Sequence, residues 1–296
     1  MVRVPAPGSR LDKGQLDFEQ APDHSVEVMS VATRKVLVTG GTSGLGLAMA
    51  TALAQAGATV ALTGRSGARA AAVAAELPGA VGLELDVREE SSVSRAVDQA
   101  WSRLGGIDML VNNAGIGMRT VNPRFMTHRQ GFWEVPPDGF RAVIETNLTG
   151  YFLVAREVTP RLLAAGGGRI VNVSVNESTM RRAGFVPYGP SRAGSESLSR
   201  IMAADLRDTG VTVNLLLPGG ATVTGMLPPD AVPQGQGFLE PGVMGPPIVW
   251  LASDEAAGVH DERIVATEFD RWLRSRKTGQ PARERILLSD NLGQWA

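Results

Sequence analysis

Cysteine is absent from the sequence, and the 296 residues include only three histidines, His24, His128 and His260. The absence of cysteine excludes a disulfide framework, a Cys-ligated zinc ion, an iron–sulfur cluster and a thiol nucleophile. The histidines are far apart in the chain, which argues against a histidine-rich metal site. We therefore predict no metal centre.

Long apolar runs and an excess of one charge are also missing. No stretch of about 18 apolar residues could form a transmembrane helix, and the polar N-terminus lacks the apolar run of a secretory signal peptide. The chain has 29 Lys and Arg against 30 Asp and Glu, a net charge of −1, so no overall field attracts nucleic acid or anionic lipid. We expect a cytoplasmic protein without nucleic-acid or membrane partners.

From residue 35 onwards, short apolar runs alternate with Ala-rich periodic stretches. The apolar runs predict strands that are covered on both faces, and the periodic stretches predict helices. The pattern therefore predicts an α/β fold, a single Rossmann-like doubly wound parallel sheet with helices on both faces. The predicted strands are 35–39, 59–63, 81–85, 109–111, 170–173, 212–217 and 263–266. The predicted helices are 44–56, 67–77, 90–103, 138–165, 189–208 and one within 245–253.

We expect one folded domain between two polar ends. Residues 1–33 lack apolar periodicity and predict a flexible N-terminal arm, and the Rossmann-fold domain is expected over 34–272. The polar C-terminal tail, 273–296, is expected either to be loose or to dock on a neighbouring subunit.

A glycine-rich turn, TGGTSGLG over residues 39–46, follows the first predicted strand. Glycines allow a tight turn and bring backbone N–H groups close to a pyrophosphate, which the N-terminus of the following helix also favours. An ordinary flexible loop is the alternative, but the strand before and the helix after favour a dinucleotide site. The candidate cofactor-binding residues here are Gly40, Thr42, Ser43, Gly44, Leu45 and Gly46.

The second and third predicted strands end in residues that bear on the choice of cofactor. Arg65 stands where NAD-binding enzymes usually carry an acidic residue for the ribose 2′-hydroxyl. A guanidinium pairs with a 2′-phosphate, so NADP(H) is favoured over NAD(H), with a solvated arginine as the alternative. Asp86, followed by Val87, either accepts a hydrogen bond from the adenine amino group or caps the next helix.

Further motifs follow in order: Asn112-Asn113-Ala114-Gly115, Asn147 in ETNLTG, Tyr188-Gly189-Pro190-Ser191-Arg192, and Pro218-Gly219. With the glycine turn, they make the sequence resemble the short-chain dehydrogenases/reductases from about residue 35 to about residue 269. The resemblance implies that Asn113, Ala114 and Gly115 lie beside the adenosine ribose. It also implies that Pro218, Gly219 and a nearby threonine, Thr222 or Thr224, contact the nicotinamide end.

The chemistry that the resemblance implies is hydride transfer between a nicotinamide and a carbonyl or alcohol carbon, with Tyr188 as the proton donor. A cation at residue 192 lies on the same helix face as Tyr188, so it can hold the cofactor ribose and favour the ionised tyrosine. The resemblance also implies that Asn147 binds a water connecting this pair to bulk solvent. A purely structural Asn147 would equally need hydrogen-bond partners.

Two positions depart from the family pattern. Arg192 replaces the usual lysine, and its planar guanidinium is effectively never deprotonated. Its positive charge still favours the ionised tyrosine, but a proton relay of the lysine type is impaired. Val175 stands where the family places a serine. The neighbouring Ser174 would point to the opposite face of an extended strand unless a bulge shifts it. Asn176 and Ser178, in the loop that follows, are the candidate replacements.

Two loops and two helices bear on the substrate and the partners. Residues 116–133 form either a pocket wall or an anchor, and Arg181 and Arg182 either pair with an acidic substrate or are solvated. The Pro- and Gly-rich segment 227–247 is typical of a substrate lid, and its apolar residues favour a small apolar molecule. The helices 138–165 and 189–208 resemble the pair through which family members form a homodimer or homotetramer.

The sequence thus favours an NADP(H)-preferring oxidoreductase of the short-chain dehydrogenase/reductase type. The alternative is a protein of the same fold whose altered site performs a non-redox step or cofactor-dependent binding.

Overall fold

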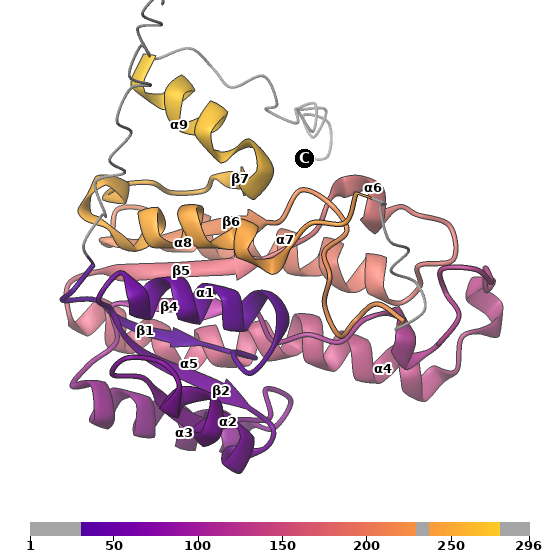
Figure 1. Cartoon of the computed structure of the whole chain (residues 1–296), viewed down its shortest axis with the longest axis horizontal. Coiled ribbons are helices and arrows are strands. Elements are labelled where there is room, and N and C mark those ends of the chain that lie inside the picture. Colours follow the sequence, from indigo (N-terminus) through magenta and orange to yellow (C-terminus); the bar gives the residue numbers. More distant parts are fainter. Residues whose placement is uncertain (1–30, 229–236, 279–296) are drawn as a thin grey trace, which may run out of the picture.

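The computed structural model describes residues 31–228 and 237–278 of the chain. Its centre is a seven-stranded sheet in the order β3-β2-β1-β4-β5-β6-β7, in which every neighbouring pair is parallel (Figure 1). The chain winds outwards from β1 to β3 and then, from β4, outwards in the other direction. The predicted doubly wound α/β fold is confirmed.

The elements lie close to their predicted positions. The strands are β1 (Lys35–Val38), β2 (Thr59–Gly64), β3 (Val81–Glu84), β4 (Met109–Asn112), β5 (Gly168–Val173), β6 (Val211–Leu217) and β7 (Arg263–Val265). The helices are α1 (Gly44–Gln55), α2 (Gly67–Ala75), α3 (Glu90–Leu104), α4 (Pro137–Ile144), α5 (Gly150–Ala164), α6 (Glu177–Met180), α7 (Tyr188–Asp205), α8 (Gly245–Ala252) and α9 (Phe269–Thr278).

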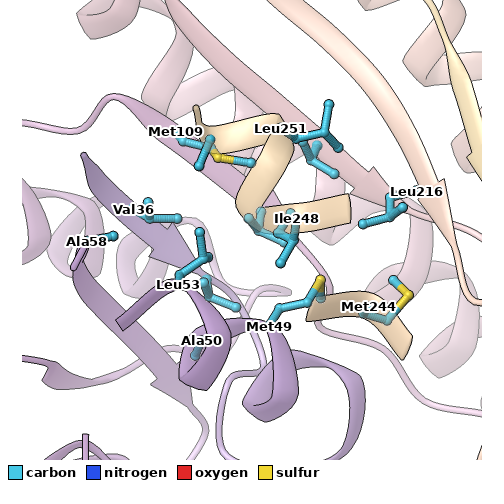
Figure 2. Packing of buried hydrophobic residues seen from close by; sticks show 14 of the residues in the cluster. Val36, Met49, Ala50, Leu53, Ala58, Met109, Leu216, Met244, Ile248 and Leu251 are labelled. Carbon is cyan, nitrogen blue, oxygen red and sulfur yellow. The ribbon is translucent and has the colours of Figure 1, made fainter. Parts of the chain in front are cut away.

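Two apolar clusters cover the two faces of the sheet. On one face, Leu53 of α1 and Ile248 of α8 pack against Val36 and Met109 of the sheet (Figure 2). On the other face, α3, α5 and α7 pack on the alternate residues of the same strands, among them Leu37 and Leu110. Because successive strand residues point to opposite faces, the continuous apolar runs of the sequence supply both clusters.

The structure differs from the sequence-based prediction at the helix expected over 138–165. This segment divides into α4 and α5, joined by a π-helical turn, Glu145–Thr149, that contains Asn147. The short helix α6 and the helix α9 were not predicted. In α9, Trp272 stacks on Phe269 and meets Trp250 of α8 edge to face, which holds this helix on the core.

The predicted N-terminal arm lies outside the described residues except for 31–33, of which Val31 is buried in the core. The tail beyond Thr278 and the lid residues 229–236 also lie outside them. Within the described ranges, no helix combines the length and the apolar composition needed to cross a bilayer.

The packing of α1 on the sheet can be tested with Leu53→Ala. Leu53 is fully buried, so the substitution should leave a cavity and lower the free energy of unfolding by about 2–5 kcal/mol in chemical denaturation. Leu163→Ala, at an exposed position of α5, is the control and should change it by about 0.5 kcal/mol or less. Equal effects of the two substitutions would contradict this placement of α1.

Candidate active site

The glycine-rich turn leaves β1 at the carboxyl edge of the sheet and leads into α1. Gly40 and Gly44 have φ of +65° and +56°, in the left-handed region that favours glycine. A Cβ at Gly46 would lie 2.3 Å from both Asn113 Nδ2 and Gly40 O. The turn therefore admits no side chain at Gly46 and brings its backbone close to the edge of the sheet.

Asn113, after β4, joins this turn to the neighbouring strand end. Its Nδ2 donates to Thr39 O (3.0 Å) and Gly40 O (3.1 Å), and Thr39 Oγ1 accepts from the backbone N–H groups of Asn113 and Ala114. Ser43, the N-cap residue of α1, makes no side-chain hydrogen bond to the first turn of the helix. These first N–H groups suit the phosphates of a dinucleotide, so the residues present fit such a cofactor.

The ends of β2 and β3 lie beside the turn. Arg65 is exposed directly after β2. Asp86 accepts from Arg88 Nε at 2.9 Å and Nη2 at 2.5 Å, and the hydrogen bond from Arg88 lowers the pKa of the Asp86 carboxyl. The alternative that Asp86 caps the next helix is wrong, because the N-cap residue of α3 is Glu89. Val87 packs against Gly150 at the start of α5.

Tyr188 and Arg192 lie one turn apart at the start of α7, as the sequence indicates. The Cζ atom of Arg192 is 5.4 Å from the centre of the Tyr188 ring. Arg192 is only 3% exposed. The structure therefore brings the guanidinium and the phenol together at the carboxyl edge of the sheet.

Sequence reasoning missed the principal partner of Arg192, which is Tyr151 of α5. Arg192 Nη1 donates to Tyr151 Oη at 2.8 Å and to Val173 O at 3.1 Å. Burial raises the pKa of the Tyr151 phenol above its usual value, so this tyrosine is neutral. One signal was present: Tyr151 is the only other tyrosine of the chain, and it lies four residues after Asn147.

The side chain of Asn147 joins three segments of the site. Its Oδ1 accepts from the N–H of Ile116 at 2.9 Å, and its Nδ2 donates to Ile116 O at 2.9 Å and to Ser191 Oγ at 3.0 Å. It is completely buried. These bonds fix the chain after Gly115 against α7, and the water-binding role of Asn147 stays a prediction.

Ser174 and Val175 directly follow β5. Ser174 is buried and its Oγ donates to Glu196 Oε1 at 2.5 Å. Glu196 in turn accepts from Arg263 Nε at 3.0 Å, and Arg263 Nη2 donates to Val175 O at 2.8 Å. Ser174 thus faces this ion pair, as strand alternation predicts, and does not replace the missing serine.

The two candidate replacements differ in their surroundings. Asn176 Nδ2 donates to Gly219 O at 2.9 Å, which ties the end of β5 to the Pro218-Gly219 segment after β6. Ser178 is exposed on α6. Thr222 is buried, and its Oγ1 donates to Gly220 O at 3.2 Å. Thr224 lies against Gly44, since a Cβ on Gly44 would be 3.3 Å from its methyl group.

The glycine-rich turn over residues 39–46, called the glycine cradle below, lies at the same edge of the doubly wound sheet as a tyrosine–cation pair. This combination is typical of a nucleotide-dependent oxidoreductase. Residues 34–231 match the family described as short chain dehydrogenase. The chain belongs to this family, and it is an NAD(P)-dependent oxidoreductase.

Individual relatives agree with this assignment. The chain is 33% identical over 238 residues to the 2,5-dichloro-2,5-cyclohexadiene-1,4-diol dehydrogenase of Sphingobium indicum, covering 76% of this chain and 91% of the relative. It is similar to the 3-ketoacyl-(acyl-carrier-protein) reductase of Brucella melitensis complexed with NADH (TM-score 0.70, 29% identity, 80% of this chain and 97% of that one). It is also similar to a short chain dehydrogenase of Burkholderia cenocepacia in complex with NADP (TM-score 0.68, 27% identity, 79% and 96%).

The glycine cradle is tested by Gly46→Ala. The added Cβ meets a backbone oxygen and a hydrogen-bonded amide, so the turn must move and cofactor binding should weaken by about tenfold or more, measured by calorimetry with NADPH and NADH. Gly242→Ala, where an added Cβ meets nothing within 4 Å, should bind the cofactor as the wild type does. Normal binding by Gly46→Ala would place the cofactor elsewhere.

Proposed function

We propose that the enzyme transfers a hydride between the nicotinamide of NADP(H) and the carbonyl or secondary alcohol carbon of a small, largely apolar molecule, with Tyr188 as general acid and base. The observation that carries this proposal is the buried guanidinium of Arg192 against the Tyr188 ring. A fixed positive charge beside a phenol stabilises its anion and so assists proton transfer in both directions.

Tyr188 handles the proton of this reaction. The bound nicotinamide supplies or accepts the hydride at the substrate carbon. In the direction of reduction, the phenol of Tyr188 gives its proton to the substrate oxygen, and the tyrosinate that remains is stabilised by Arg192 until solvent reprotonates it. In the direction of oxidation, the tyrosinate takes the alcohol proton.

A second hydrogen-bond donor to the substrate oxygen is assigned to Asn176. An amide nitrogen carries two N–H groups, and Gly219 O accepts one of those of Asn176. Within the described residues, Asn176 Nδ2 makes no second hydrogen bond. Ser178, the other candidate, is exposed on α6, which favours Asn176 for this role.

A cavity of about 350 Å³ between residues 125–129 and 182–185 is the pocket that we assign to the substrate. Phe125 and Phe185 meet edge to face there, with ring centres 5.8 Å apart. Arg129 and Arg182 also line the cavity, whereas Arg181 pairs with Glu177 outside it. This mixed lining supports the pocket-wall role for the segment around Phe125, and it suits a small molecule that carries both an apolar and a negative group.

A homodimer or homotetramer is supported by apolar side chains left exposed on α5 and α7. Phe152 is 45% exposed and Ile201 is 56% exposed. Leu153, in contrast, is buried in the core cluster that α5 shares with the sheet. The outer faces of these two helices are thus the surface that we assign to contact between subunits.

The role of Tyr188 is tested by Tyr188→Phe. Loss of the phenol oxygen should lower kcat by roughly a hundredfold or more, measured by the absorbance of NADPH with a carbonyl substrate found by screening. Cofactor binding should persist, because the glycine cradle is untouched. Turnover at the wild-type rate would refute the assignment of Tyr188.

The preference for NADP(H) is tested by Arg65→Ala. Loss of one charge-assisted hydrogen bond to the 2′-phosphate should weaken NADPH binding by about tenfold and leave NADH binding unchanged. Arg103→Ala, an exposed arginine at the C-terminal end of α3, is the matched control and should affect neither. Equal affinities of Arg65→Ala and the wild type for NADPH would contradict the proposal.

A further inference from the structure

Both tyrosines of the chain lie against one guanidinium. The Cζ atom of Arg192 is 5.6 Å from the centre of the Tyr151 ring and 5.4 Å from that of the Tyr188 ring. Tyr151 comes from α5, and Tyr188 and Arg192 from α7. The positive charge is therefore held between a phenol of the core and the phenol at the site.

Tyr151 Oη completes a closed set of hydrogen bonds on the core side of Arg192. Arg192 Nη1 donates to Tyr151 Oη and to Val173 O, and Tyr151 Oη donates to the same carbonyl at 3.1 Å. Tyr151 is 1% exposed. Its rotation is restricted by packing, so its oxygen is a fixed acceptor for the guanidinium.

The protonation states of Arg192 and Tyr151 agree with these hydrogen bonds. Burial alone would lower the pKa of Arg192, but the phenolic oxygens of Tyr151 and Tyr188 raise it above its usual value, so the guanidinium remains charged. A buried charge without hydrogen bonds is strongly unfavourable. The neutral phenol of Tyr151 and the carbonyl of Val173 are the partners that make burial of this cation possible.

The opposite edge of the guanidinium faces the segment after β4. A Cβ on Gly115 would lie 2.5 Å from Arg192 Nη2, so only glycine leaves room for that group beside the segment after β4. Arg192 Nε is buried and has no hydrogen-bond partner in the described part of the chain. On the core side, Arg192 Nη1 therefore has hydrogen-bond acceptors, whereas Nε on the remaining edge of the guanidinium has none among the described residues.

We propose that Tyr151 is a positioning residue of the catalytic site, which fixes the guanidinium of Arg192 beside Tyr188 and keeps its Nε and Nη2 edge directed at the cofactor. This inference rests on the proposed acid and base role of Tyr188. A lysine carries its charge on a single ammonium group, whereas arginine has a longer planar group that needs a fixed orientation. Tyr151 supplies that orientation, so an arginine serves at this position.

The test compares Tyr151→Phe with Ser199→Ala. Ser199 is a buried hydroxyl of α7 that accepts from Asn172 Nδ2 at 2.8 Å, away from Arg192. Both variants lose one buried hydroxyl, so both are expected to have a somewhat lower melting temperature. Only Tyr151→Phe should weaken NADPH binding to the free enzyme, by about tenfold, in a calorimetric titration.

The variant Arg192→Lys separates positioning from packing. A shorter ammonium side chain does not depend on Tyr151, so Tyr151→Phe should change NADPH affinity in the Arg192→Lys background by less than twofold, against about tenfold in the wild-type background. Equal losses in both backgrounds, or an unchanged NADPH affinity in Tyr151→Phe, would show that Tyr151 is only a packed core residue and would overturn the proposal. Failure of the acid and base role of Tyr188 would show instead as normal turnover of Tyr188→Phe.

Discussion

Burial of the positive charge of Arg192 is the constraint on which the arrangement of the site depends. An ion removed from water is stable only where hydrogen-bonding groups replace its hydration. Here two groups replace it, the phenol of Tyr151 on α5 and the carbonyl of Val173 at the end of β5. Gly115 after β4 leaves the room that Nη2 needs. Correct placement of the charge beside Tyr188 therefore requires that α5, β4, β5 and α7 be packed together first.

The parallel sheet supplies that packing. All of its strands end at the same edge, so the glycine turn after β1 and the segments after β4, β5 and β6 meet without long connections. Asparagine amides then hold these ends in pairs: Asn113 joins the segment after β4 to the turn after β1, and Asn176 joins the segment after β5 to Gly219 after β6. Asn147, in the π-helical turn between α4 and α5, holds the segment after β4 at Ile116.

The sequence predicts the parts of this structure that depend on local pattern. The apolar runs fix the strands, because residues buried on both faces must be apolar throughout, and the glycine turn is recognisable because no other residue tolerates its backbone. Contacts between distant segments leave no such pattern. Tyr151 and Arg192 are 41 residues apart, and nothing local marks Tyr151 as a hydrogen-bond partner. The π-helical turn around Asn147 interrupts an apolar periodicity that reads as one continuous helix, and α9 depends on aromatic contacts with α8.

The two positions at which we expect departures from the family pattern, Arg192 and Val175, have different surroundings. The arginine that replaces the lysine is surrounded by compensating features, since Tyr151 accepts its hydrogen bond and Gly115 leaves room for Nη2. The valine that replaces the serine is not compensated by its neighbour, because the hydroxyl of Ser174 is bonded to Glu196 on the other side of the strand. Glu196 and Arg263 also hold the carbonyl end of Val175 in place, so the strand cannot slip by one residue to present Ser174. The charge of Arg192 therefore has hydrogen-bond partners of its own, whereas the hydroxyl of Ser174 is held away from the position of Val175, which is why we propose Asn176 as the second donor to the substrate oxygen.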